Sequence, residues 1–89
     1  MKRESEVIVK NDLGLHTRPA TVIVKMIQNC DCCVEFTYNK QTINAKSILS
    51  ILMLAAPRDS RLKITVDGND ADQVMKDLVN AFEREFDER

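Results

Sequence analysis

The sequence lacks the long apolar run that a membrane-spanning helix requires. Its apolar stretches are far shorter than the roughly 18 residues needed to cross a bilayer, and the opening segment MKRESEVIVK has no apolar core of a secretory signal peptide. Neither charge sign dominates, because 13 basic and 14 acidic side chains leave a net charge of -1, so electrostatic attraction to nucleic acid or anionic lipid is not expected. We therefore expect a cytoplasmic protein, with no nucleic-acid partner and no membrane insertion, that binds another protein or a small anion.

Cysteine is scarce and confined to one place, where Cys30, Cys32 and Cys33 lie within four residues. Their odd number and the absence of an export signal argue against a disulfide framework, so we expect reduced thiols at a junction between a helix and a strand. A zinc site usually pairs C-x2-C with a second, distant pair of ligands. No metal and no cofactor are expected, and a thiol-binding or metal-binding domain is the weakest of the alternatives.

Eighty-nine residues suffice for one domain with a modest core, but not for a deep substrate cavity. Alternation of apolar and polar residues predicts strands over 6–10, 33–39, 41–45 and 61–68, and helical spacing predicts helices over 19–29, from Ser47 to the residues before Pro57, and from Asp70 onward. Val74, Leu78, Ala81, Phe82 and Phe86 lie at helical spacing in the last helix, and Asp70 and Gln73 occupy the positions of a capping box.

The element order is then β-α-β-β-α-β-α, without internal repeats or linkers. Helices inserted between the strands of a four-stranded, mostly antiparallel sheet pack on one of its faces. We expect a two-layer α+β domain that comprises residues 1–89. Both early helices follow strands directly, so their N-termini, near His16 and near Ser47, should be exposed and carry unpaired N–H groups.

The only histidine of the chain lies in NDLGLHTRPA, residues 11–20. If a helix begins at Arg18 or Pro19, His16 and Thr17 lie just before it or cap it, beside free N–H donors and the positive end of the helix dipole. Gly14 permits a backbone angle that other residues disfavour, and the Arg18 guanidinium matches phosphate oxygens. A neutral imidazole nitrogen can attack phosphorus, so these residues suit a phosphoryl acceptor. An exposed, chemically idle histidine is the alternative that spacing alone leaves open.

GLHTRPA, residues 14–20, together with NAKSILSILMLA, residues 44–55, resembles the HPr family, the histidine-containing phosphocarrier proteins of the sugar phosphotransferase system. The resemblance extends over nearly the whole chain. It implies an open-faced β-sandwich with three helices on one side of the sheet. It also implies a phosphoryl carrier that is a substrate in a relay and not an enzyme.

By this resemblance, His16 accepts a phosphoryl group on Nδ1 from phosphorylated enzyme I and passes it to enzyme IIA proteins. Arg18 assists the transfer, and Thr17 and Arg18 offer backbone N–H groups to the phosphate. Ser47 matches a serine that an ATP-dependent kinase phosphorylates in some members, which makes a serine kinase or phosphorylase a further partner. An N-cap role explains the serine equally well. A regulatory binding module controlled by Ser47 therefore stays open as a second function.

The surface beside His16 is expected to dock these partners. The helix after Ser47 is too apolar for its length to bury every large side chain, and the first helix carries polar residues off its core face. The expected docking residues are Thr21, Lys25, Ile48, Leu49 and Leu52. A monomer suits a protein that meets several partners through one face.

Two departures from the family pattern concern loops. The family commonly has Asn-Gly where this chain has Asn39-Lys40, so one of these two residues must adopt a positive φ or the turn must differ. After the second helix, Ala55, Ala56 and Asp59 stand where glycines are usual. These departures affect the exit of that helix and leave the histidine segment unchanged.

Overall fold

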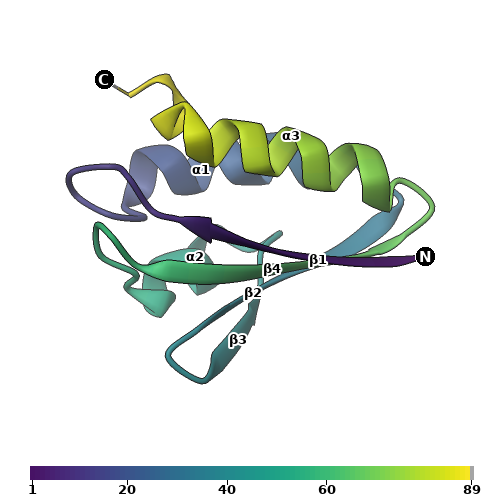
Figure 1. Cartoon of the computed structure of the whole chain (residues 1–89), viewed down its shortest axis with the longest axis horizontal. Helices are drawn as coiled ribbons and strands as arrows, with labels where there is room; N and C mark the ends of the chain where they lie inside the picture. Colours follow the sequence, from purple (N-terminus) through teal and green to yellow (C-terminus); the bar gives the residue numbers. More distant parts are fainter. Residues whose placement is uncertain (89) are drawn as a thin grey trace.

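The computed structural model describes residues 1–88 and shows the predicted order of strands and helices (Figure 1). A short 3-10 helix, η1, follows the last α-helix. The elements are β1 (Lys2–Ile8), α1 (Thr17–Ile27), β2 (Cys32–Tyr38), β3 (Gln41–Asn44), α2 (Ile48–Leu54), β4 (Arg61–Gly68), α3 (Ala71–Glu83) and η1 (Glu85–Asp87). None of the helices within residues 1–88 is long and apolar enough to cross a membrane.

The four strands form one sheet in the order β1-β4-β2-β3, and every neighbouring pair is antiparallel. The register places Val34 opposite Val66 and Phe36 opposite Ile64, and residues directly opposite one another point to the same face of a sheet. This face is apolar, and α1 and α3 cover it (Figure 1). The predicted α+β fold, with a four-stranded antiparallel sheet and three helices, is confirmed.

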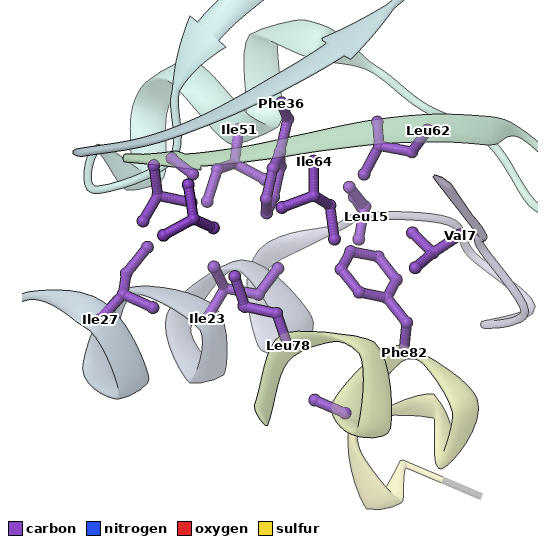
Figure 2. Close-up of a cluster of buried hydrophobic side chains, with 14 of the residues drawn as sticks. Val7, Leu15, Ile23, Ile27, Phe36, Ile51, Leu62, Ile64, Leu78 and Phe82 are labelled. Carbon is purple, nitrogen blue, oxygen red and sulfur yellow. The ribbon is translucent and has the colours of Figure 1, made fainter. Parts of the chain in front are cut away.

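The core lies between the sheet and the helices, as Figure 2 shows. Phe36 and Ile64 of the sheet, Ile23 of α1 and Ile51 of α2 are fully buried, and each side chain of this size contributes about 1.5–3 kcal/mol by leaving water. Phe82 of α3 meets Phe36 edge to face, with ring centroids 5.9 Å apart. Long-range contacts of this kind fix how α3 lies across the sheet and where its C-terminal end arrives.

Two predictions about α3 are wrong. Phe86 lies beyond the helix, which ends at Glu83, and has a φ of +54°; it is buried through a ring contact with Phe82 at 4.8 Å. The capping box is absent, because Asp70 has a near-zero ψ and its carboxylate accepts the backbone N–H of Asp31 at 3.1 Å. Gln73 donates to Asp77 instead.

The expectation of three reduced thiols is also wrong. Cys30 and Cys32 form a disulfide across the junction of α1 and β2, and Cys33 is free and exposed. The chain turns at this junction and brings the two Cα atoms to 5.4 Å, within the range that a disulfide bridges. Residue spacing alone does not predict that turn.

The structure shows how the two loops that depart from the family pattern are built, namely the hairpin between β2 and β3 and the exit of α2. Asn39 and Lys40 both have positive φ, +51° and +67°, which is the backbone of a two-residue turn between antiparallel strands. Ala55 ends α2 in the left-handed conformation and its N–H donates to the Leu52 carbonyl at 3.1 Å. Asp59, at +72°, makes a further left-handed turn before β4.

Glycine at position 55 is expected to stabilise the protein. A left-handed residue with a Cβ costs about 1–2 kcal/mol, and Ala55 is exposed, so Ala55→Gly removes that strain without opening the core. The midpoint of thermal unfolding, followed by circular dichroism, should rise by about 4–8 °C per kcal/mol in a domain of this size. Ala56→Gly is the matched control: Ala56 is buried and has no positive φ, so this change should lower the midpoint. A lower midpoint for Ala55→Gly would contradict the account of strain.

Candidate functional site

The segment before α1 is held against the exit of α2. Gly14 adopts a φ of +68° and its N–H donates to the Asn11 carbonyl at 2.9 Å, closing a turn. Leu15 is buried, and its N–H donates to the Ala56 carbonyl at 3.0 Å. A Cβ at position 14 would lie 2.4 Å from that same carbonyl oxygen, so only glycine fits. The turn and the anchored leucine leave the next residue, His16, at the surface.

His16 is the N-cap residue of α1, which begins at Thr17, one or two residues earlier than the sequence suggested. Its side chain makes no capping hydrogen bond, so the imidazole is available for other partners. The N–H groups of the first helical turn have no carbonyl partner within the helix; Pro19 has no N–H, and Ala20 donates to the His16 carbonyl at 3.1 Å. Thr17 and Arg18 therefore supply the N–H groups at this end of the helix.

The imidazole contacts a residue that sequence reasoning missed. His16 Nε2 lies 2.8 Å from Glu88 Oε2. The Asn11 amide Nδ2 donates to Glu88 Oε1 at 2.5 Å and to the Glu85 carbonyl at 2.9 Å. Glu88 reaches this position because η1 turns the chain back after α3, with buried Phe86 as its anchor. Seventy-two positions separate His16 from Glu88, and nothing in the sequence pattern pairs them.

This contact determines which nitrogen of the neutral ring carries the proton. An ionised carboxylate only accepts hydrogen bonds, so Nε2 is the donor and Nδ1 keeps its lone pair. The side chains of His16 and Glu88 are 30% and 16% exposed, which leaves the ring accessible while the carboxylate is mostly covered. When the ring is neutral, the site thus presents an unprotonated Nδ1 at the start of a helix.

Glu88 is ionised at neutral pH. Burial of its carboxyl group raises the pKa, but hydrogen bonds from Asn11 and His16, the charge that His16 carries when its ring is protonated, and the charge of Arg18 outweigh burial and lower the pKa below its ordinary value. The Arg18 guanidinium is 71% exposed, and its Nε lies 3.8 Å from Glu88 Oε2. That separation is longer than a hydrogen bond, so Arg18 can turn toward an anion at Nδ1 without leaving a buried carboxylate unpaired.

A surface hollow borders the imidazole. It is lined by Asn11, Asp12, Leu13, His16, Glu85 and Glu88. Of these lining residues, Leu13 is a large apolar side chain that is mostly exposed. The structure thus brings His16, Thr17 and Arg18 together at one accessible point, as their spacing predicts.

Ser47 caps α2, and its hydroxyl accepts the N–H of Ser50 at 3.2 Å. Among the expected docking residues on α2, Leu49 is 67% exposed and Ile48 is 37% exposed, whereas Leu52 is half-buried against the core. Met53, 71% exposed, joins them and was missed. On α1, Lys25 is exposed, and the Thr21 hydroxyl donates to the Thr17 carbonyl at 2.8 Å.

Comparison with known proteins identifies the family. A family model described as "PTS HPr component phosphorylation site" matches residues 3–84. The phosphocarrier protein HPr of Chlamydia pneumoniae is 44% identical over 85 residues, which cover 96% of this chain and 79% of that protein. The corresponding protein of Chlamydia muridarum is 40% identical over 81 residues, which cover 91% of this chain and 78% of that protein.

Solved structures agree. The structure of HPr from Thermoanaerobacter tengcongensis superimposes with a TM-score of 0.93 at 30% identity, covering 98% of each chain. HPr from Bacillus anthracis gives a TM-score of 0.84 at 31% identity, covering 91% of this chain and 95% of the other. Family membership implies enzyme I and enzyme IIA proteins as partners. The chain belongs to the HPr family, the non-enzymatic phosphocarrier proteins of the phosphotransferase system.

Proposed function

We propose that His16 is the phosphoryl acceptor and that Nδ1 is the reacting atom. The observation that carries the proposal is the contact between His16 Nε2 and Glu88, because it leaves the Nδ1 lone pair unprotonated at an accessible helix N-terminus. Nδ1 attacks the phosphorus held by enzyme I, and the nitrogen–phosphorus bond forms as the bond to enzyme I breaks. The reverse sequence at an enzyme IIA protein returns His16 to its starting state.

Arg18 and Thr17 stabilise the phosphoryl group during this transfer. Phosphoryl transfer depends on positioning and on neutralising charge on the phosphoryl oxygens. The free N–H groups of Thr17 and Arg18 point out of the start of α1, where the helix dipole favours an anion. The exposed guanidinium of Arg18 adds a charged donor. We infer that residues 1–89 act as one carrier domain and as a monomer, because each partner needs the same face.

The direct test is incubation with phosphoenolpyruvate and enzyme I. The protein should gain one phosphoryl group per chain, and the phosphate should be labile in acid, as a nitrogen–phosphorus bond is. Addition of an enzyme IIA protein should remove it. In a separate incubation with ATP and a serine kinase, acid-stable phosphate would report Ser47. Acid-stable phosphate without any acid-labile phosphate would favour a regulatory binding module over a carrier.

The docking surface proposed for these partners contains Ile48 and Leu49 of α2 and Thr21 and Lys25 of α1, with half-buried Leu52 beneath it. Exposed Met53 extends its apolar part. Two large apolar side chains at 67% and 71% exposure on a seven-residue helix are typical of a protein-binding surface. Contact between α2 and α1, the helix that His16 caps, supports a docking surface near the imidazole.

We propose that Ser47 is a regulatory phosphorylation site for a serine kinase and phosphorylase, and Ser47→Asp tests the effect of charge. A carboxylate at the start of α2 suits the helix dipole, so the variant should fold normally. Added negative charge beside Ile48 and Leu49 should oppose an acidic partner and slow phosphoryl transfer from enzyme I by about tenfold, or ~1.4 kcal/mol.

Ser47→Asn is the matched control for this prediction. Asparagine keeps a side-chain oxygen for the Ser50 N–H and adds no charge, so transfer should proceed at the wild-type rate. Equal rates for Ser47→Asp and Ser47→Asn would contradict an electrostatic effect at this position.

Glu88→Gln is expected to lower stability in a pH-dependent way. The pKa of Glu88 is lower in the folded protein than in the unfolded chain, so its contribution is full above the unfolded pKa and is lost as pH falls through the folded pKa. Loss of its charge-assisted hydrogen bonds should cost about 1–2 kcal/mol at pH 7. Urea unfolding at pH 7 and below pH 4 should show this difference shrinking in acid.

Glu35→Gln is the control for Glu88→Gln, because Glu35 is an exposed carboxylate on β2. It should leave the free energy of unfolding close to that of the wild type at both pH values. A constant difference between Glu88→Gln and the wild type across this pH range would show that the carboxylate of Glu88 is not held by its partners.

A further inference from the structure

The three cysteines form a cluster that phosphoryl transfer does not use. Cys30 follows α1, where its N–H donates to the Ile27 carbonyl at 3.1 Å, and Cys32 is the first residue of β2. A disulfide joins these two residues, and the exposed thiol of Cys33 comes next in the strand. The bridge spans one intervening residue, Asp31.

This disulfide is not needed to hold the fold. The entropy that a cross-link removes from the unfolded chain grows with the length of the closed loop, and a separation of two residues closes nearly the shortest loop available. Cys30 and Cys32 are only partly buried at the margin of the core. Neither is among the large, fully buried side chains that join the sheet to the helices.

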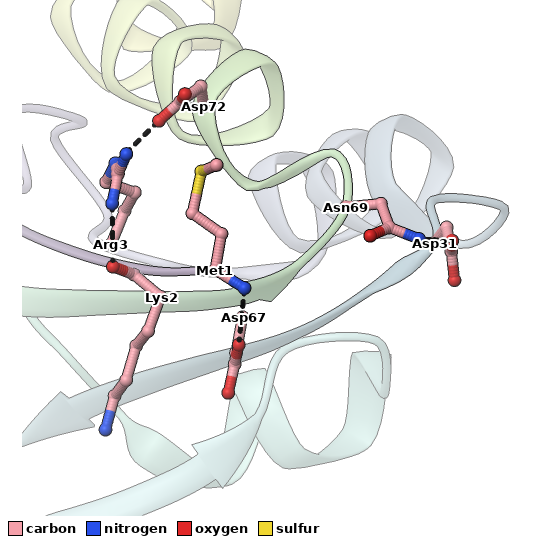
Figure 3. Close-up of polar contacts among 7 residues, drawn as sticks. All are labelled: Met1, Lys2, Arg3, Asp31, Asp67, Asn69 and Asp72. Carbon is pink, nitrogen blue, oxygen red and sulfur yellow. Dashed lines mark hydrogen bonds and ion pairs between the residues drawn. The ribbon is translucent and has the colours of Figure 1, made fainter.

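The shape of the junction is fixed by hydrogen bonds that do not involve sulfur. Asp31, between the two cysteines, donates its N–H to the Asp70 carboxylate at 3.1 Å and accepts the Asn69 N–H at its carbonyl at 3.1 Å. The Asn69 side chain donates to the Asp31 carboxylate at 2.6 Å, and Figure 3 shows these two side chains facing one another. Since residue 31 is clamped to the loop before α3, the flanking cysteines remain close together when the disulfide is reduced.

The cluster is open to small molecules. A surface hollow at this junction is lined by Cys30, Asp31, Cys32, Cys33, Lys46, Asp67, Gly68 and Asn69. On its rim, the Lys46 ammonium donates to the Cys30 carbonyl at 3.2 Å. A low-molecular-weight thiol or disulfide can therefore reach the sulfur atoms without unfolding of the chain.

We propose that Cys30 and Cys32 are a reversible dithiol–disulfide couple that exchanges with small thiols and disulfides. In oxidation, the thiolate of one cysteine attacks a small disulfide, forms a mixed disulfide and releases one small thiolate. The second cysteine's thiolate then attacks the protein sulfur of that mixed disulfide and releases the second small thiolate. The protein loses two electrons and two thiol protons, and the small disulfide becomes two thiols. Reduction is the reverse.

The test uses the full chain equilibrated with mixtures of reduced and oxidised glutathione, then quenched in acid and alkylated. Mass spectrometry should show that Cys30 and Cys32 lose their alkylation together as the mixture becomes oxidising, while Cys33 remains alkylated. Cys33→Ser should keep this two-thiol step. Cys30→Ser and Cys32→Ser should each lose it. Circular dichroism should show the same folded protein at both ends of the series.

Three outcomes would overturn the couple. The first is a Cys30–Cys32 disulfide that excess dithiothreitol does not reduce in the folded protein, because such a disulfide is not reversible. The second is a pair of thiols at Cys30 and Cys32 that oxidised glutathione does not oxidise. The third is oxidation that forms disulfides only between two protein molecules and none between Cys30 and Cys32 of one chain. His16→Ala should exchange like the wild type, so failure of the thiol couple and failure of the phosphocarrier proposal are distinguishable.

Discussion

Replacement of His16 by alanine is expected to abolish phosphoryl transfer from enzyme I, with a loss of more than about 10³-fold that reflects removal of the attacking nitrogen. His16 is the only histidine in the chain, so no second imidazole replaces it. The imidazole makes no capping hydrogen bond and is partly exposed, but its loss removes one hydrogen bond to Glu88, so the free energy of unfolding should fall by about 1–2 kcal/mol, which leaves the protein folded. Acid-labile phosphate from labelled phosphoenolpyruvate measures the transfer.

The control for His16→Ala is Ser47→Ala, which removes the hydroxyl at the start of the other exposed helix. It should keep acid-labile phosphorylation and lose any acid-stable phosphate added by a serine kinase. Acid-labile phosphate in His16→Ala at the wild-type level would place the acceptor elsewhere. The two variants together separate the carrier from a module controlled only at Ser47.

Local signals in the sequence were sufficient to predict the region of the histidine site. Glycine before the histidine and proline after it have direct consequences for backbone angles and for N–H donors, and the structure places both in those roles at Gly14 and Pro19. The observed start of α1, Thr17, differs by one or two residues from the predicted start, because sequence patterns do not define helix ends to the exact residue. The accessible imidazole could therefore be predicted from the seven residues 14–20 alone.

The second half of the site could not be predicted, because it depends on contacts across the whole chain. Glu88 reaches His16 only after α3 crosses the sheet and the chain reverses through positive φ angles at Glu85, Phe86 and Asp87. Residues 85–87 include no glycine or asparagine, the residues that usually indicate positive φ angles in a sequence. Phe86 fits the helical period of α3 but is buried through Phe82 outside the helix. Tertiary packing, and not the helical period, thus determines the position of Phe86.

Gly14→Ala is expected to destabilise the protein by about 3 kcal/mol or more. The φ of +68° is costly for a residue with a Cβ, at about 1–2 kcal/mol, and that Cβ would lie 2.4 Å from the Ala56 carbonyl oxygen and 2.8 Å from Pro57 Cα. Both neighbours are backbone atoms, so the loop or the exit of α2 must move. The thermal midpoint should fall by more than about 10 °C, and phosphoryl acceptance should decline because the Leu15 anchor before His16 is displaced.

Asp12→Ala separates this effect from a general sensitivity of the loop. Asp12 is exposed and pairs only with the exposed Arg58 at 3.1 Å among the residues described, and a surface pair of this kind contributes about 0–1 kcal/mol. Its removal should leave both the thermal midpoint and phosphoryl acceptance close to the wild type. If Gly14→Ala and Asp12→Ala gave the same thermal midpoint and the same phosphoryl acceptance, the proposal that close packing of Gly14 against the exit of α2 positions His16 would be wrong. A drop in both for Gly14→Ala alone ties the position of the imidazole to the contact between these two loops.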